Sequence, residues 1–169
     1  MIKIEKTTDN AFFSQKIRIK KIYSNTELNL HEYFYNKTKI FPENVIIMKQ
    51  FIFFFINNED YFEAKSFLNS IRKQLERKVI LIRAENVLIK LLFSFFPDPY
   101  IHDIKIEIVK KDKKEFKTII ICFLSFEERG IAIGRKGDYI KAVNDLIEKF
   151  IIFEKETIPL RIKCEMVNL

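Results

Sequence analysis

The chain has 169 residues, enough for one domain with a sizeable extension, and its 48% hydrophobic content excludes a wholly disordered protein. The formal net charge of +7 indicates an anionic partner, and it favours nucleic acid over a membrane surface. The two cysteines each lie in an alternating, strand-like run, so we expect buried thiols rather than a disulfide framework.

Neither a targeting segment nor a membrane span is expected. The first residues lack the apolar region of a signal peptide and the Arg-rich, acid-poor character of a transit peptide. The most hydrophobic stretch, residues 45–56, is about half as long as a bilayer requires, and Lys49 and Gln50 interrupt it. We interpret this stretch as a buried helix or an interface segment.

Residues 1–83 are predicted to form a mainly helical N-terminal extension. Residues 17–20 alternate as a short strand, residues 23–30 form a polar connection, and residues 32–38 are helical. From Tyr61 to Leu75, apolar residues recur at helical spacing, with basic residues on the other faces. We expect most phenylalanines of this half to fill a core and some to be available to a partner.

Residues 84–169 are predicted to be a second, separate domain of mixed α+β class. A helix is expected to stop before the prolines at 97 and 99, and a charged connection at 110–115 to join two strands. The predicted elements are a helix at 84–96, strands at 104–108 and 116–124, a short helix at 126–132, a helix at 138–151 and a strand at 158–166.

All three glycines of the chain lie within residues 130–137. Glycine permits a positive φ and a close approach of other groups to the backbone. Gly134 and Gly137 bracket Arg135 and Lys136 just before a predicted helix, whose N-terminal dipole attracts anions. Main-chain N–H groups and the two full charges therefore predict a phosphate-facing loop. We expect Gly130 to serve the turn or close packing before that loop.

The element order, together with Ile133-Gly134-Arg135-Lys136-Gly137 and the following Ile140, resembles the KH domain in its type II topology over residues 84–167. The resemblance implies a three-stranded sheet packed on helices. It also implies an RNA site in which the loop clamps about four nucleotides and an apolar groove reads the bases. The RNA-binding residues that it implies are Gly134, Arg135, Lys136, Gly137, Ile133, Ile140 and Lys141, with Val143 as a further groove residue.

Two interpretations stay open for several of these positions. Plain core packing accounts for Ile133, Ile140 and Val143 at least as well as a groove does. Asp138 either weakens the positive field of the loop or favours the N-terminus of the next helix.

No catalytic constellation is recognisable, so we expect no enzyme activity, no metal and no cofactor. His31 and His102 are the only histidines and belong to different segments, and no Cys–His spacing suits a metal site. No Walker loop, nucleophile elbow or dinucleotide-binding fingerprint is present.

The whole chain most resembles the KH-bearing protein family of the small ribosomal subunit. That resemblance implies contacts with rRNA and with neighbouring ribosomal proteins. The composition is rich in Ile, Lys, Asn and Phe, which indicates an AT-rich genome and favours a mitochondrial, organelle-encoded protein over one of the bacterial cytoplasm. The basic N-terminal opening of the family is not recognisable. The domain that follows its KH core is also missing, which predicts a shortened or split form whose remainder is either lost or encoded as a separate chain.

Two alternatives belong to other functional classes. Residues 132–137 are close to the loops of NusA, which favours a NusA-like or free-standing KH factor in transcription or RNA handling. The other alternative is an assembly scaffold that uses the fold for protein contacts, with the phenylalanines of the first half as its docking surface.

Overall fold

A computed structural model describes residues 2–7, 10–155 and 159–167 and confirms the mixed α+β class. The elements are β1 Ile2–Thr7, α1 Asn10–Phe13, β2 Ile17–Ile19, α2 Asn25–Thr38, β3 Asn44–Met48, β4 Phe51–Ile56, α3 Tyr61–Lys65, α4 Leu68–Leu75, β5 Lys78–Arg83, α5 Leu88–Ser94, β6 Asp103–Lys111, β7 Lys114–Phe123, α6 Phe126–Ile133, the 3₁₀ turn η1 Arg135–Gly137, α7 Asp138–Phe150, β8 Ile151–Phe153 and β9 Leu160–Met166.

The chain contains the same arrangement of elements twice. The first unit, from α2 to β5, runs helix, strand, strand, helix, helix, strand. The second unit, from α5 to β9, has the same order with two short additions, η1 between its last two helices and β8 after α7. In each unit the first two strands are antiparallel, and the second strand pairs in parallel with the last. The element order predicted for the second unit is therefore observed, whereas its repetition in the first unit was not predicted.

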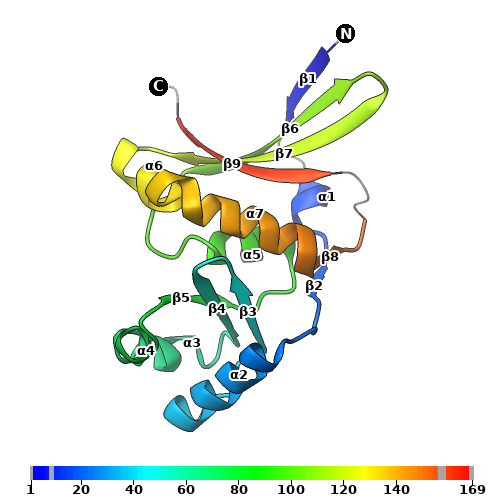
Figure 1. The fold of residues 1–169 in the computed structure, drawn as a ribbon. Coiled ribbons are helices and arrows are strands. Elements are labelled where there is room, and N and C mark those ends of the chain that lie inside the picture. Colours follow the sequence, from blue (N-terminus) through cyan, green and yellow to red (C-terminus); the bar gives the residue numbers. More distant parts are fainter. Residues whose placement is uncertain (1, 8–9, 156–158, 168–169) are drawn as a thin grey trace.

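The two units stack as alternating layers of sheet and helix (Figure 1). The sheet β1-β6-β7-β9 forms the outer layer, and helices α5, α6 and α7 lie beneath it. The sheet β3-β4-β5 follows, with α2, α3 and α4 on its far side. The short strands β2 and β8 pair beside this stack. The helices of the second unit thus lie between two sheets.

Strand β4 contributes side chains to both cores. Phe51, Phe53 and Phe55 pack with the helices of the second unit, whereas the alternate residues from Ile52 to Ile56 pack with α2, α3 and α4. All six side chains of the strand are buried. A strand buried on both faces reads as a continuous apolar run rather than an alternating one.

The helix predicted for residues 45–56 is therefore wrong, whereas the predicted burial of the stretch is confirmed. The stretch is a β-hairpin whose turn is Lys49-Gln50, with a positive φ of 56° at Lys49. Strands β1 to β5 all lie within residues 1–83, so the predicted mainly helical character of this extension is also wrong. The sequence pattern does not indicate a strand here because its two faces are equally hydrophobic, which removes the alternation that marks a strand.

Helix α2 begins earlier than predicted, at Asn25, and replaces the expected polar connection at 23–30. The Ser24 hydroxyl accepts from the Glu27 amide at 3.2 Å, and the Glu27 carboxylate accepts from the Ser24 amide at 2.9 Å. This reciprocal capping box stabilises the first turn. Glu27 also accepts from the Ile47 amide at 2.8 Å, which ties the helix to β3.

Other boundaries also differ from the prediction, and the helix expected at 84–96 is the shorter α5, Leu88–Ser94. The expected helix over residues 61–75 is divided into α3 and α4. The charged connection at 110–115 is mostly strand, and its turn is Asp112-Lys113, where both residues have the positive φ that a tight hairpin turn favours. The last strand begins at Leu160, and the predicted start at Ile158 lies outside the described residues.

Gly130 lies inside helix α6, so neither the predicted turn nor close packing explains it. A Cβ at this position would meet nothing within 4 Å. We expect Gly130→Ala to raise the free energy of unfolding by about 0.5–1 kcal/mol, because alanine loses less backbone entropy in a helix. Urea denaturation of both proteins measures this change, and a lower midpoint in the variant would contradict it.

Candidate nucleic-acid interface

The loop between α6 and α7 has the backbone that the glycine pair predicted. Gly134 and Gly137 have φ of 81° and 73°, and Lys136 between them has φ of 55°. The Gly134 amide donates to Gly130 O at 3.0 Å and the Gly137 amide to Gly134 O at 3.1 Å. Arg135 and Lys136 are exposed at the tip. The structure thus brings the four predicted loop residues into one tight basic turn.

Gly134 and Gly137 are required for different reasons. At Gly134, with ψ of 174°, a Cβ would lie 2.2 Å from Asp138 Oδ1 and 2.9 Å from the Tyr139 amide nitrogen. At Gly137 the nearest neighbour would be Lys141 Cε at 3.8 Å, so only the left-handed backbone opposes a side chain.

We therefore expect Gly134→Ala to lower the free energy of unfolding by about 3 kcal/mol and Gly137→Ala by only about 1 kcal/mol. The loop must also move in the Gly134 variant, because backbone atoms occupy the space of the new methyl group. Urea denaturation and RNA titration of the two variants make the comparison. Equal losses at the two glycines would contradict the steric explanation.

Asp138, directly after the loop, is held by the first unit. Its Oδ2 accepts from Lys78 Nζ and from Gln50 Nε2, both at 2.9 Å. Desolvation raises the pKa of this carboxyl, but the hydrogen bonds from Lys78, Gln50 and the Tyr139 amide outweigh it and hold the pKa below its ordinary value. Asp138 is therefore ionised at neutral pH, and Lys78 offsets its charge. It also occupies the first turn of α7, as one of the two interpretations predicted.

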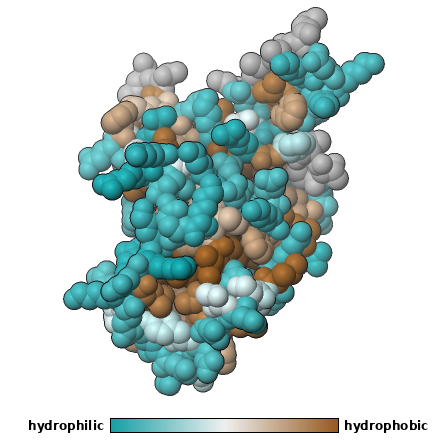
Figure 2. Space-filling model, in the orientation of Figure 1, coloured by the Kyte–Doolittle hydropathy of each residue, from teal (hydrophilic) through white to brown (hydrophobic). Residues whose placement is uncertain are grey.

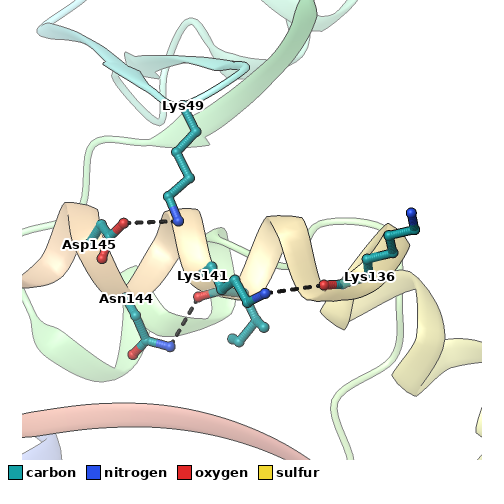
Figure 3. Close-up of polar contacts among 6 residues, drawn as sticks. Lys49, Lys136, Lys141, Asn144 and Asp145 are labelled. Atoms are coloured by element: carbon teal, nitrogen blue, oxygen red, sulfur yellow. Dashed lines mark hydrogen bonds and ion pairs between the residues drawn. The ribbon is translucent and has the colours of Figure 1, made fainter.

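A second contact ties the first unit to α7 (Figure 3). Lys49 Nζ, in the β3–β4 turn, lies 3.2 Å from Asp145 Oδ2. In the same view, Lys141 Nζ reaches back from α7 and donates to Lys136 O at 3.4 Å. Lys141 therefore adds its charge beside the loop. Sequence reasoning missed the partners Lys49, Gln50 and Lys78, because they lie far from the loop along the chain.

The apolar residues near the loop separate into two groups. Ile133 and Ile140 are half-buried and flank Gly137, since their Cγ2 atoms would lie 3.9 and 4.0 Å from a Cβ there. Val143 is fully buried in the core shared with the sheets. Ile133 and Ile140 thus support the loop, and core packing accounts for Val143.

Backbone groups of the edge strand β9 form hydrogen bonds with side chains from α6 and α7. The Asn144 side chain donates to Ile162 O at 3.0 Å and accepts from the Ile162 amide at 2.7 Å. Arg129 Nε donates to Cys164 O at 3.2 Å. Cys164 and Cys122 are buried and form no disulfide, as predicted, and desolvation raises the pKa of Cys164 to about 12. The contacts of Asn144 and Arg129 therefore attach helices α6 and α7 to the β9 edge of the sheet.

A cleft of about 260 Å³ opens beside the loop, between the two units. Gly134 and Arg135 line it from the second unit, and Lys65 and Lys78 from the first. Its apolar lining includes Phe51, Phe96 and Tyr139. Figure 2 shows hydrophobic, brown surface between the two units, bordered by hydrophilic, teal side chains. This hollow beside the loop is therefore an inter-unit cleft, whose lining does not include Ile133 or Ile140.

Tyr139 connects this cleft to the core. Its hydroxyl donates to Phe95 O, and its ring meets Phe51 edge-on, with the ring centroids 5.3 Å apart. Burial raises the pKa of Tyr139 far above its ordinary value, so the hydroxyl stays protonated. Tyr139 is thus packed against the first unit, and because it lies in the first turn of α7, this contact positions the start of that helix.

Other kinds of site find no support in the described ranges. Across residues 2–7, 10–155 and 159–167, no group of three or more His, Cys, Asp or Glu side chains is placed to hold a metal ion. Within the same ranges, no helix has both the length and the apolar character needed to cross a bilayer.

Comparisons with known proteins give a likeness of fold. No protein-family model matches the chain, and no curated protein is significantly similar to it. Among solved structures, the crystal structure of APE1850 is similar, with a TM-score of 0.58 and 17% sequence identity. The match covers 83% of this chain and 100% of that one. The similarity extends over both units.

Proposed function

We propose that the chain binds single-stranded RNA through the loop of residues 134–137, and that its second unit is a type II KH module. The observation that carries this proposal is the loop itself. Two glycines of positive φ lie between two helices, and Arg135 and Lys136, which separate the glycines, are exposed at the tip of the loop. The order of helices and strands around the loop supports the KH assignment.

The side chains of the tip supply the phosphate contacts in this proposal. The amides of Gly134 and Gly137 already donate within the protein, so the glycines serve to shape the backbone. Arg135 offers a planar fork of donors, and Lys136 a mobile point charge. Lys141 adds a third cation. The carboxylate of Asp138 does not cancel this field, because Lys78 pairs with it at 2.9 Å.

A titration with single-stranded and duplex RNA of equal length tests the proposal. We expect the single strand to bind more tightly, since a KH loop clamps a single strand whose bases are unstacked and accessible. Fluorescence anisotropy with labelled oligonucleotides measures both affinities. Equal affinity for the two forms would indicate general attraction to phosphate and would contradict a KH site.

The cellular setting that we propose is the small ribosomal subunit, on the sequence resemblance given above, in an organelle or in the bacterial cytoplasm. A NusA-like role is the second candidate, favoured by residues 132–137. Sedimentation of a cell extract, with mass spectrometry of the associated RNA and proteins, separates the two. Co-sedimentation with small subunits after a moderate salt wash supports the first, and association with RNA polymerase supports the second. A scaffold would keep its partners after acidic replacement of Arg135 and Lys136.

A further inference from the structure

We propose that the RNA strand continues from the loop through the inter-unit cleft and stacks on an aromatic surface of the neighbouring helices. We define this aromatic surface as Phe62, Arg83, Lys90 and Phe93. The inference rests on the proposed RNA binding and adds a second contact region to it.

The rings of the aromatic surface are exposed. Phe62 in α3 is 70% exposed and Phe93 in α5 is 47% exposed, and both line one hollow of about 330 Å³. The Arg83 guanidinium carbon lies 4.1 Å from the ring centroid of the buried Tyr61 and 5.1 Å from that of Phe62. Tyr61 thus holds a planar cation beside an exposed ring.

The same hollow is rich in positive charge. Lys65, Arg83 and Lys90 line it, against a single acid, Glu85. Glu85 accepts a hydrogen bond from Asn58 at 2.9 Å. Within the described part of the chain, Lys65 and Lys90 have neither an ion pair nor a side-chain hydrogen bond, so both cations are available to an anion.

The hollow and the inter-unit cleft form one path. Tyr61, Lys65 and Pro97 line both of them. At its other end the cleft is lined by Gly134 and Arg135 of the loop. A strand clamped at the loop can therefore enter the cleft, pass Lys65 and reach the aromatic surface. The cleft also contains two acids, Asp98 and Asp138, and Lys78 pairs with Asp138.

Single-stranded RNA fits this path better than an acidic protein segment does. Its phosphates alternate with flat bases, and the hollow at the end of the path offers both cations and the exposed rings of Phe62 and Phe93. Bases stack on aromatic faces whatever their identity, and Arg83 provides a further planar cation for stacking. An acidic peptide would use the lysines but would leave the faces of Phe62 and Phe93 without partners.

The test compares oligouridines of about four and about twelve nucleotides, because the shorter one fills only the loop. In the wild-type protein the longer RNA should bind more tightly. The variant Phe62→Ala/Phe93→Ala should lose at least about tenfold in affinity for the longer RNA, with the shorter one unaffected. The matched control Phe41→Ala/Phe126→Ala removes two other exposed rings, 67% and 73% exposed, and should bind both oligomers like the wild type.

A second variant, Lys65→Glu/Lys90→Glu, should reduce the salt dependence of binding for the longer RNA only. The path is refuted if both path variants bind the longer RNA like the wild type while acidic replacement of the loop cations abolishes binding; RNA binding by the loop would then still stand. If the loop replacement leaves both oligomers bound, the proposed function itself fails. Loss of an acidic protein partner by the path variants, with RNA affinity intact, would also overturn the inference.

Discussion

RNA binding should weaken by about two orders of magnitude when Arg135 and Lys136 are both replaced by glutamate. In the proposed complex, each wild-type cation meets a phosphate through a charge-assisted contact, and each acid would repel that phosphate. For single strands, the slope of log affinity against log salt changes by about 0.7 for every phosphate contact. The double variant should therefore have a slope shallower by about 1.4. Titrations at several salt concentrations provide both quantities.

The matched control is Lys20→Glu/Lys21→Glu, which changes the net charge by the same amount. Both lysines are exposed, and the Lys20 amide donates to Phe150 O at the far end of α7. A helix of 13 residues places this site about 20 Å from the loop. We expect only a small loss of affinity in the control. Equal losses in the two variants would mean that general charge, and not the loop, attracts the RNA.

Lys78→Ala should weaken RNA binding even if Lys78 never touches RNA. Without Lys78, the carboxylate of Asp138 faces the phosphates unpaired, and a repulsion of about 1 kcal/mol corresponds to roughly fivefold in affinity. Asp138→Asn should have the opposite effect and tighten binding, because Lys78 then keeps its charge. The double variant should return close to the wild-type affinity, since it removes a pair whose net charge is zero.

Binding titrations of Lys78→Ala, Asp138→Asn and the double variant measure the three RNA affinities of this double-mutant cycle. If the double variant stays as weak as Lys78→Ala, Lys78 contacts the RNA directly and the masking of Asp138 is not its role. Unfolding measurements are the accompanying control. The ion pair is partly exposed, so its removal should change the free energy of unfolding by less than about 1 kcal/mol.

The second unit was largely predictable because its strands and helices carry clear periodicities. In β6, Ile104 and Ile106 are buried and Lys105 between them is exposed, which is the alternation of a half-solvated strand. The loop glycines were predictable for a related reason. A chain with three glycines places two of them where φ is positive.

The first unit was harder to predict because it is covered on both sides. Its central strand β4 shows no alternation, and only the polar pair Lys49-Gln50 indicated that the apolar run folds back on itself. The start of α2 did have a sequence signal, the Ser24 and Glu27 of a capping box. The partners of Asp138 had none, because only the tertiary fold brings Gln50 and Lys78 to it.

The sharing of α5 and α7 between two sheets has a consequence for the thermodynamics of recognition. Two RNA-binding modules on a flexible linker must lose freedom of relative motion when both engage one strand, and their gain depends on effective concentration. Here buried side chains such as Phe53 and Tyr139 fix one unit against the other before any ligand arrives. The protein has already lost this conformational entropy in folding, so an RNA strand bound as we propose would meet a preorganised surface.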